Sequence, residues 1–257
     1  MAEPSPGQID PPGRPHRPLP AYYADGAERP GWVRGIFDRT AVDYDRIERL
    51  MALGTGPWYR RQALLRAGLR PGMDVLDVGI GTGLTAREAL RVIGEAARLT
   101  GVDPSRGMLD QVRLPAPVRL LQGTAEALPV ADASCDFLSM GFALRHVESL
   151  PAAFGEFRRA LRAGGRVCVL EITRPEGAVA TALLKAYLRG LVPLYARLFA
   201  RHADTAALMR YYWDTIEACV PPARVAQSLA EAGFAQVERH VELGIFSEYR
   251  ARRPPEA

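Results

Sequence analysis

Between residues 75 and 170, short apolar runs alternate with stretches in which apolar residues recur every three or four positions. The first pattern is typical of buried strands and the second of amphipathic helices. We expect strands at 75–78, 99–102, 118–121, 137–140 and 167–170, and helices at 82–93, 105–112 and 150–161. Strands that alternate with helices in this way predict a parallel sheet covered by helices on both faces.

Helical spacing also precedes and follows this region. Residues 32–69 predict two helices, separated by a glycine- and proline-containing break at 53–57. Two or three further helices are expected between residues 178 and 232, and the segments 235–240 and 242–250 predict a final strand pair. The predicted fold is a doubly wound, mostly parallel α/β sheet of seven strands, Rossmann-like, with an N-terminal helical cap.

Composition sets the limits of this domain. Residues 1–30 contain eight of the 21 prolines, so we expect a disordered tail there. What remains is a single domain over residues 31–253, with the cap at 31–70 and a helical insertion at 178–232.

Charge and cysteine content exclude several classes of protein. The net charge is +4 and no block of five basic residues occurs, which argues against a nucleic-acid partner. The three cysteines, at 135, 168 and 219, are too far apart for a metal site and too few for a disulfide framework. No secretory signal and no apolar run long enough to span a bilayer is present. We therefore expect a cytoplasmic protein without a metal.

The most informative motif is a glycine loop that follows the first expected strand. Asp77 ends the strand, and Gly79, Gly81 and Gly83 follow at alternate positions. Glycines let a backbone approach a bulky ligand, and the loop opens a helix. Dinucleotide-binding loops have their third glycine one residue later, where this chain has Leu84. The spacing instead suits S-adenosylmethionine (SAM), whose ammonium Asp77 would attract. A tight turn without a ligand is the alternative.

Two later strand ends extend this predicted cofactor site. Asp103 closes the second strand, where a carboxylate can accept both ribose hydroxyls of an adenosine. Its alternative role is to cap the helix that begins near Ser105. Met108 would pack on the adenine or in the core. Backbone groups of Thr124 and Ala125 are the expected partners of the purine, unless they form an ordinary surface turn.

Several longer segments resemble one family of enzymes. The segments FDRTAVDYD at 37–45, DFLSMGFALRHV at 136–147, FGEFRRALRAGGRVCVLE at 154–171 and YWDTI at 212–216 are similar to the ubiquinone/menaquinone biosynthesis C-methyltransferases, which are class I SAM-dependent methyltransferases. The resemblance covers roughly residues 32–250. It implies cofactor contacts at Thr82, Asp103, Thr124, Ala125 and Gly141.

Three departures from the family pattern concern the methyl acceptor. The family's Phe-Gly-Leu-Arg-Asn reads Phe-Ala-Leu-Arg-His at residues 142–146. A His-Arg-x-Trp pattern is replaced by Gly-Pro-Trp-Tyr from residue 56, and an asparagine near residues 50–51 is missing. These positions face the acceptor pocket in the family, so the departures leave the methyl donor unaffected. The chain has no asparagine at all, so His146 reflects either codon usage or a new role.

Methylation of a ring carbon needs a base, or a cation that lowers the pKa of the neighbouring hydroxyl. We expect Arg145 to stabilise the phenolate and His146 to assist proton removal. The alternatives are a salt bridge from Arg145 to Asp38 or Glu171, and a structural role for the histidine. Tyr44, from the cap, is the third catalytic candidate, because aromatic walls suit a flat quinol ring.

The segment 178–200 has two interpretations. Its apolar residues at 184, 188, 191, 195 and 198 follow helical spacing, and Pro193 should kink the helix. The helix either packs on the domain or lies at a membrane surface and helps to draw in a prenylated substrate.

The predicted function is C-methylation of a quinol or phenolic ring, with peripheral membrane contact at most and a homodimer left open. The alternatives are C-, O- or N-methylation of an aromatic or polyketide natural product, and a non-catalytic SAM-binding module.

Overall fold

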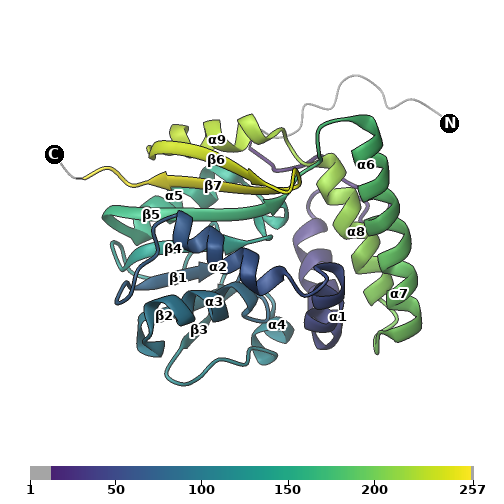
Figure 1. Ribbon diagram of the computed structural model, residues 1–257, viewed down its shortest axis with the longest axis horizontal. Coiled ribbons are helices and arrows are strands. Elements are labelled where there is room, and N and C mark those ends of the chain that lie inside the picture. Colours follow the sequence, from purple (N-terminus) through teal and green to yellow (C-terminus); the bar gives the residue numbers. More distant parts are fainter. Residues whose placement is uncertain (1–12, 256–257) are drawn as a thin grey trace.

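A seven-stranded sheet organises the computed structural model, which describes residues 13–255 (Figure 1). The strand order is β3-β2-β1-β4-β5-β7-β6. The strands are β1 (Val75–Val78), β2 (Leu99–Asp103), β3 (Arg119–Gln122), β4 (Cys135–Gly141), β5 (Leu161–Ile172), β6 (Ala235–Glu242) and β7 (Phe246–Arg252). The first five are parallel, and β7 pairs antiparallel with both β5 and β6. This is the predicted mostly parallel, doubly wound sheet.

The strand order reverses at β1. The chain proceeds outward from β1 to β2 and β3, then returns to place β4 on the other side of β1, so that Val75 pairs with both Leu99 and Phe137. Loops at the carboxyl ends of β1 and β4 therefore turn away from each other. Ligands of open α/β sheets bind in the crevice that such a reversal leaves.

Alternate residues of the strands pack into two separate hydrophobic cores, one on each face of the sheet. Leu138 and Met140 of β4 pack with Phe154 of α5 (Leu150–Ala160) and with Leu229 of α9 (Pro222–Glu231). Phe137 faces the opposite way, toward α2 (Gly56–Arg66) and α3 (Leu84–Ile93). The alternation follows from the two-residue period of a strand. Short helices α4 (Arg106–Asp110), η1 (Ala96–Arg98) and η2 (Leu144–His146) complete the domain.

A group of helices covers one end of the sheet (Figure 1). It comprises α1 (Arg29–Met51), α6 (Ala178–Lys185), η3 (Ala186–Leu191), α7 (Val192–Phe199) and α8 (Thr205–Ala218). Asp38 fixes α1 to the domain, because its carboxylate accepts hydrogen bonds from Ser105 Oγ at 2.6 Å and from the Gly107 amide at 2.8 Å. Asp43 accepts from the amides of Arg201 and His202, which joins α1 to the start of α8. The cap is therefore held by polar contacts as well as by apolar packing.

The prediction of a disordered tail over residues 1–30 is wrong for residues 13–30, and residues 1–12 lie outside the described part. The Leu150 amide donates to the Gly13 carbonyl at 2.7 Å, and the Val220 amide donates to the Pro15 carbonyl at 2.7 Å. Tyr23 is buried, and α1 already begins at Arg29. Prolines lack an amide hydrogen, but the carbonyls of such a segment remain free to accept hydrogen bonds. The aromatic side chains then supply the buried area that proline-rich sequence usually lacks.

The apolar stripe predicted for residues 178–200 is also partly wrong. Leu188 is buried, but Leu191 and Leu198 are 60% and 68% exposed, and the buried face continues through Val192 and Ala196. The reason is that η3 is a π-helix, which has more residues per turn than an α-helix. The buried face therefore shifts by one residue, and Val192 rather than Leu191 follows Leu188 on it. The expected distortion at Pro193 thus takes the form of a π segment that ends just before it.

Candidate functional site

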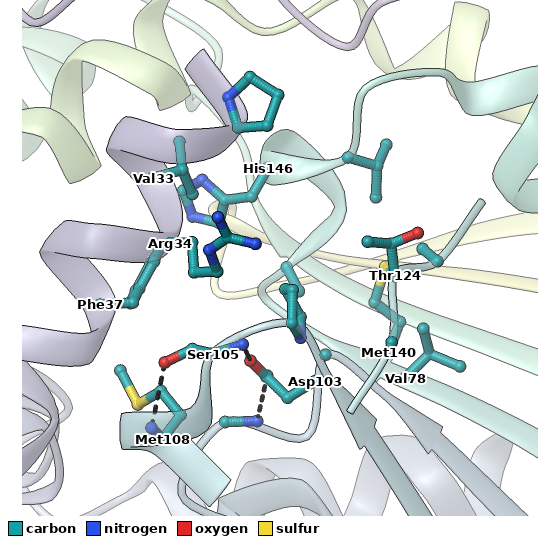
Figure 2. A pocket seen from close by; sticks show the side chains of 18 of the residues that line it. Val33, Arg34, Phe37, Val78, Asp103, Ser105, Met108, Thr124, Met140 and His146 are labelled. Atoms are coloured by element: carbon teal, nitrogen blue, oxygen red, sulfur yellow. Dashed lines mark hydrogen bonds between the residues drawn. The ribbon is translucent and has the colours of Figure 1, made fainter. Parts of the chain in front are cut away.

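A pocket lies at the sheet edge where the strand order reverses, between the loops that follow the first four strands and helix α1 (Figure 2). Most of the predicted site residues line it: Tyr44, Gly79, Gly81, Asp103, Met108, Thr124, Ala125, Gly141 and His146. Three predicted cofactor residues, Asp77, Thr82 and Gly83, do not line it. The topology therefore brings together residues from five separate segments of the chain.

The glycine loop is shaped by steric need. Gly79 has φ of 67°, and a Cβ built on it would lie 2.6 Å from the Ala143 Cβ. A side chain at this position would push the loop after β1 away from the loop after β4. The Gly79 and Ile80 amides both donate to the Val102 carbonyl, which holds the turn against β2. Glycine at this position therefore lets the loops after β1 and β4 approach closely, with the backbone of Gly79 bordering the pocket.

Asp103 points into the pocket and is anchored at both oxygens (Figure 2). It accepts hydrogen bonds from the amides of Gly81 and Ser105, each at 2.8 Å. Burial raises the pKa of Asp103 from 3.8 to about 6. The alternative that Asp103 caps α4 is wrong, because Ser105 is the cap and accepts from the Met108 amide through its own hydroxyl. Each carboxylate oxygen keeps a lone pair for a hydroxyl donor.

Asp77 is a buried acid with one unsatisfied oxygen. One carboxylate oxygen accepts from Ser139 Oγ at 2.6 Å, while the other has no hydrogen-bond partner. Burial raises the pKa of Asp77 from 3.8 to about 7. An orphaned carboxylate oxygen behind a glycine loop fits a cationic ligand such as the ammonium of SAM. Thr82 and Gly83 shape the same loop, since Thr82 donates to Asp45 of α1 and Gly83 precedes α3 in a left-handed conformation.

Helix α1 contributes pocket residues that sequence analysis missed. Val33, Arg34 and Phe37 line the site, and Figure 2 shows the Arg34 side chain extending into it beside His146. Arg34 is otherwise an ordinary exposed helical arginine, so no local pattern distinguishes it. Only the docking of α1 over the sheet edge gives it a place in the pocket.

Arg145 lies outside this pocket, fully buried among protein groups. It forms an ion pair with Glu171, donates from Nε to Thr215 Oγ at 3.1 Å, and lies 3.9 Å from the centre of the Tyr212 ring. Of the two structural partners proposed for it, Glu171 is the one found, whereas Asp38 binds Ser105 instead. A catalytic role for Arg145 stays a prediction.

His146 lines the first pocket, the one between α1 and the strand loops, with its ring 5.1 Å from that of Phe37. Its Nδ1 has no hydrogen-bond partner. Burial, and then the neighbouring charges of Arg145 and Arg29, hold the pKa of His146 well below its ordinary value. The ring is therefore neutral, and a role for His146 in proton removal stays a prediction.

A second pocket adjoins the first, because Tyr44 and Phe142 line both. Its walls include Glu48, Tyr59, Arg60, Ile172, Tyr187, Tyr212 and Phe246. Phe142 adopts φ of 60°, a left-handed conformation that is costly for a bulky residue and recurs at ligand sites. Aromatic walls around a few polar groups suit a flat ring that carries hydroxyls.

Solved structures of other proteins share this fold. A SAM-dependent methyltransferase from Thermotoga maritima, described as a possible histamine N-methyltransferase, matches with a TM-score of 0.60 and 22% identity over 85% of this chain and 98% of its own. A phosphoethanolamine N-methyltransferase from Haemonchus contortus, solved with S-adenosylhomocysteine, matches with a TM-score of 0.61 and 17% identity over 86% of this chain and 60% of its own. These likenesses, at 22% and 17% identity, show that the chain has the fold of the class I SAM-dependent methyltransferases.

The particular family follows from the sequence comparisons. Residues 25–251 match the ubiE/COQ5 methyltransferase family, and the chain belongs to it. A demethylmenaquinone methyltransferase from Mycobacterium sp. strain JLS is 32% identical over 229 residues, which is 89% of this chain and 96% of that protein. The ubiquinone/menaquinone biosynthesis C-methyltransferase UbiE of Syntrophotalea carbinolica is 34% identical over 88% of this chain and 96% of that protein. The predicted family, fold, enzyme class and cofactor are confirmed.

Proposed function

We propose that this enzyme transfers a methyl group from SAM to a ring carbon of a quinol of the ubiquinone/menaquinone type. We place SAM in the first pocket, which is called the donor pocket below. The observation that carries the proposal is the aromatic-walled second pocket, which shares Tyr44 and Phe142 with the donor pocket. A ring held there would border the donor. The names of the curated relatives support the same acceptor class.

The cofactor supplies an electrophilic methyl group at its sulfonium. In our proposal Asp103 holds the ribose hydroxyls, Asp77 attracts the ammonium, and Thr124 and Ala125 border the purine. Tyr44 and Phe142 separate the two pockets and set the direction from which the ring approaches. Holding two reactants in line in this way can contribute roughly 7–11 kcal/mol to catalysis.

The test is turnover with reduced demethylmenaquinol, compared with a panel of small phenols, with the methylated atom assigned by mass spectrometry and NMR. Transfer to the quinol ring carbon is expected. Preferential methylation of a small phenol, or methylation at oxygen or nitrogen, would favour the natural-product alternative, which the departures at Gly56 and His146 motivate. SAM binding without turnover on any acceptor would favour a non-catalytic module.

We further propose that the acceptor is prenylated and that its tail leaves through an apolar groove. Tyr187 borders both the second pocket and a groove lined by Leu50, Leu53, Leu191, Val192, Leu194, Tyr195 and Leu198. The exposed leucines of this groove would rest on the membrane from which the substrate is taken. Within residues 13–255, no helix is long and apolar enough to cross a bilayer.

We propose that this membrane contact is made from the cytoplasm, which the free cysteines at 135, 168 and 219 support. Flotation with anionic liposomes tests the membrane proposal. Leu191→Glu/Leu198→Glu should abolish co-flotation, whereas Leu243→Glu, at an equally exposed leucine between β6 and β7, should not. Concentration-dependent self-association that the same double substitution abolishes would instead assign the groove to a homodimer.

A further inference from the structure

An ion pair joins the two cap helices inside the second pocket. Arg60 Nη2 of α2 donates to Glu48 Oε1 of α1 at 2.7 Å. Their side chains are only 5% and 11% exposed, and both residues line the pocket. A carboxylate and a guanidinium therefore face the space in which an acceptor ring would lie.

The backbone of α2 is adapted to this pair. A Cβ built on Gly56 would lie 2.5 Å from Arg60 Nη1 and 2.9 Å from Glu48 Oε1. Any side chain at Gly56 would therefore displace one partner or the other. The glycine stands where the family pattern begins with histidine, so this departure makes room for the pair.

Hydrogen-bonding capacity remains unused around the pair. Arg60 Nε and the Tyr59 hydroxyl are buried without a hydrogen-bond partner. Buried donors without partners are costly, so a ligand that supplies oxygen atoms would be favoured here. The Arg60 guanidinium lies 5.0 Å from the centre of the Phe142 ring, and Phe142 borders the donor pocket. The free polar groups thus lie on the side of the second pocket that adjoins the donor.

We propose that Glu48 and Arg60 bind the ring hydroxyl of the acceptor and that Glu48 takes its proton. This inference rests on the proposed function. The O–H bond breaks, the proton passes to Glu48, and the oxygen electrons increase the electron density of the adjacent ring carbon. That carbon forms the new bond to the methyl group, whose former bonding pair stays on sulfur. Loss of the ring C–H proton to water then restores the aromatic ring as a phenolate, which recovers its proton from Glu48. Arg60 stabilises the negative charge on the oxygen before methyl transfer and again before this last proton returns.

The residues first considered for this role are less suitable. His146 lines the first pocket and not the second, so its ring does not border the space in which the acceptor ring would lie. Arg145 is paired with Glu171 and lines neither of the two pockets. Glu48 is a carboxylate with an arginine partner that can stabilise the product oxyanion, in the pocket that suits the ring.

The first experiment compares Glu48→Gln, Glu48→Asp and the control Glu95→Gln, which removes a carboxylate from an exposed ion pair with Arg98. With demethylmenaquinol, Glu48→Gln should lower kcat by roughly a hundredfold or more, Glu48→Asp should restore part of it, and Glu95→Gln should change nothing. Calorimetric affinity for S-adenosylhomocysteine should be the same in all three. Normal turnover in Glu48→Gln would overturn the proposal.

A binding experiment separates this inference from the proposed function. The probes are 1-naphthol and naphthalene, titrated into protein loaded with S-adenosylhomocysteine. Glu48→Gln should weaken 1-naphthol binding about tenfold, because a charge-assisted hydrogen bond is lost, and leave naphthalene unchanged. Equal loss of both probes, or of neither, would overturn the proposal. If the wild type does not methylate demethylmenaquinol, the proposed acceptor is wrong. The binding experiment alone then decides whether Glu48 and Arg60 bind a ring hydroxyl.

A third variant tests the geometry. Gly56→Ala should reduce 1-naphthol binding and kcat without affecting S-adenosylhomocysteine, since its methyl group displaces the ion pair but not the donor loop. Gly155→Ala is the control at an exposed helical glycine of α5, where a built Cβ meets no atom within 4 Å. If Gly56→Ala behaves like Gly155→Ala, the pair does not bind the hydroxyl.

Discussion

Replacing Asp77 by asparagine should make the ligand-free protein more stable at alkaline pH while weakening its hold on SAM. The wild-type carboxyl is fully buried, and one of its oxygens has no partner. Asparagine has nearly the same shape and keeps an oxygen that can accept from Ser139 Oγ, but it carries no charge at any pH. The substitution therefore isolates the electrostatic cost of the buried carboxylate.

The size of this cost follows from the displaced pKa. Burial raises the pKa of Asp77 from 3.8 to about 7. Since one pH unit corresponds to about 1.4 kcal/mol, the ionised form is disfavoured in the folded state by roughly 4 kcal/mol. Between the two pKa values the folded state binds more protons than the unfolded state, so wild-type stability falls as pH rises through this window. Above pH 7 the full cost is present.

Urea unfolding of wild type and Asp77→Asn at pH 5 and pH 8 measures the effect. From pH 5 to pH 8 the free energy of unfolding of the variant should rise by roughly 3 kcal/mol relative to wild type. The matched control Asp110→Asn, in an exposed pair with Arg106, should show no more than about 0.5 kcal/mol of pH-dependent difference. SAM affinity should fall in Asp77→Asn because the ammonium loses its counter-charge. A stability difference that is the same at both pH values would refute the reasoning.

Three further substitutions test the site and its support. Gly79→Ala should weaken S-adenosylhomocysteine binding by roughly tenfold or more, because its Cβ would lie 2.6 Å from that of Ala143; calorimetry with unchanged affinity would contradict the steric argument. Asp103→Asn should weaken SAM about tenfold to a hundredfold but leave free adenine unaffected, and equal losses for both ligands would remove the ribose role. Arg145→Met should lower the free energy of unfolding by about 3–5 kcal/mol, because it leaves the buried Glu171 carboxylate without its partner. The double variant Arg145→Met/Glu171→Leu should recover most of this loss. If urea unfolding shows that the losses of the two single substitutions simply add, the two side chains are not energetically coupled.

The sequence predicted residues that meet in one pocket because their signals are local. Asp77 and the alternating glycines lie within one short segment, and Asp103 closes the next strand. Their loops meet because the carboxyl ends of parallel strands share one edge of a sheet. Seven of the ten predicted cofactor residues line the pocket; Thr82 and Gly83 shape its first loop, and Asp77 lies buried in β1. Apolar runs and periodicity predicted all seven strands, but β5 begins at Leu161, six residues before the predicted start, and β7 begins at Phe246 rather than at residue 242.

The acceptor side depended on partners that no local pattern reveals. Glu48 and Arg60 are 12 positions apart on different helices, and Arg145 and Glu171 are 26 apart. Which charges meet is fixed only when the helices dock, so sequence alone did not distinguish Asp38 from Glu171 as the partner of Arg145. The same holds for Arg34, an exposed helical residue that borders the pocket only because α1 lies over the sheet edge.

By itself, the chain's residue order determined the alternation of strands and helices and the glycine loop, since these depend on steric and periodic constraints within a few residues. It indicated the family through the resemblance of four longer segments. Only the tertiary structure decided that the proline-rich segment from residue 13 packs on the domain, and that a π-helix turns Leu191 and Leu198 outward. It also decided which buried charges have partners. Long-range contacts are set by the packing of the whole chain, and no short window of sequence contains both sides of them.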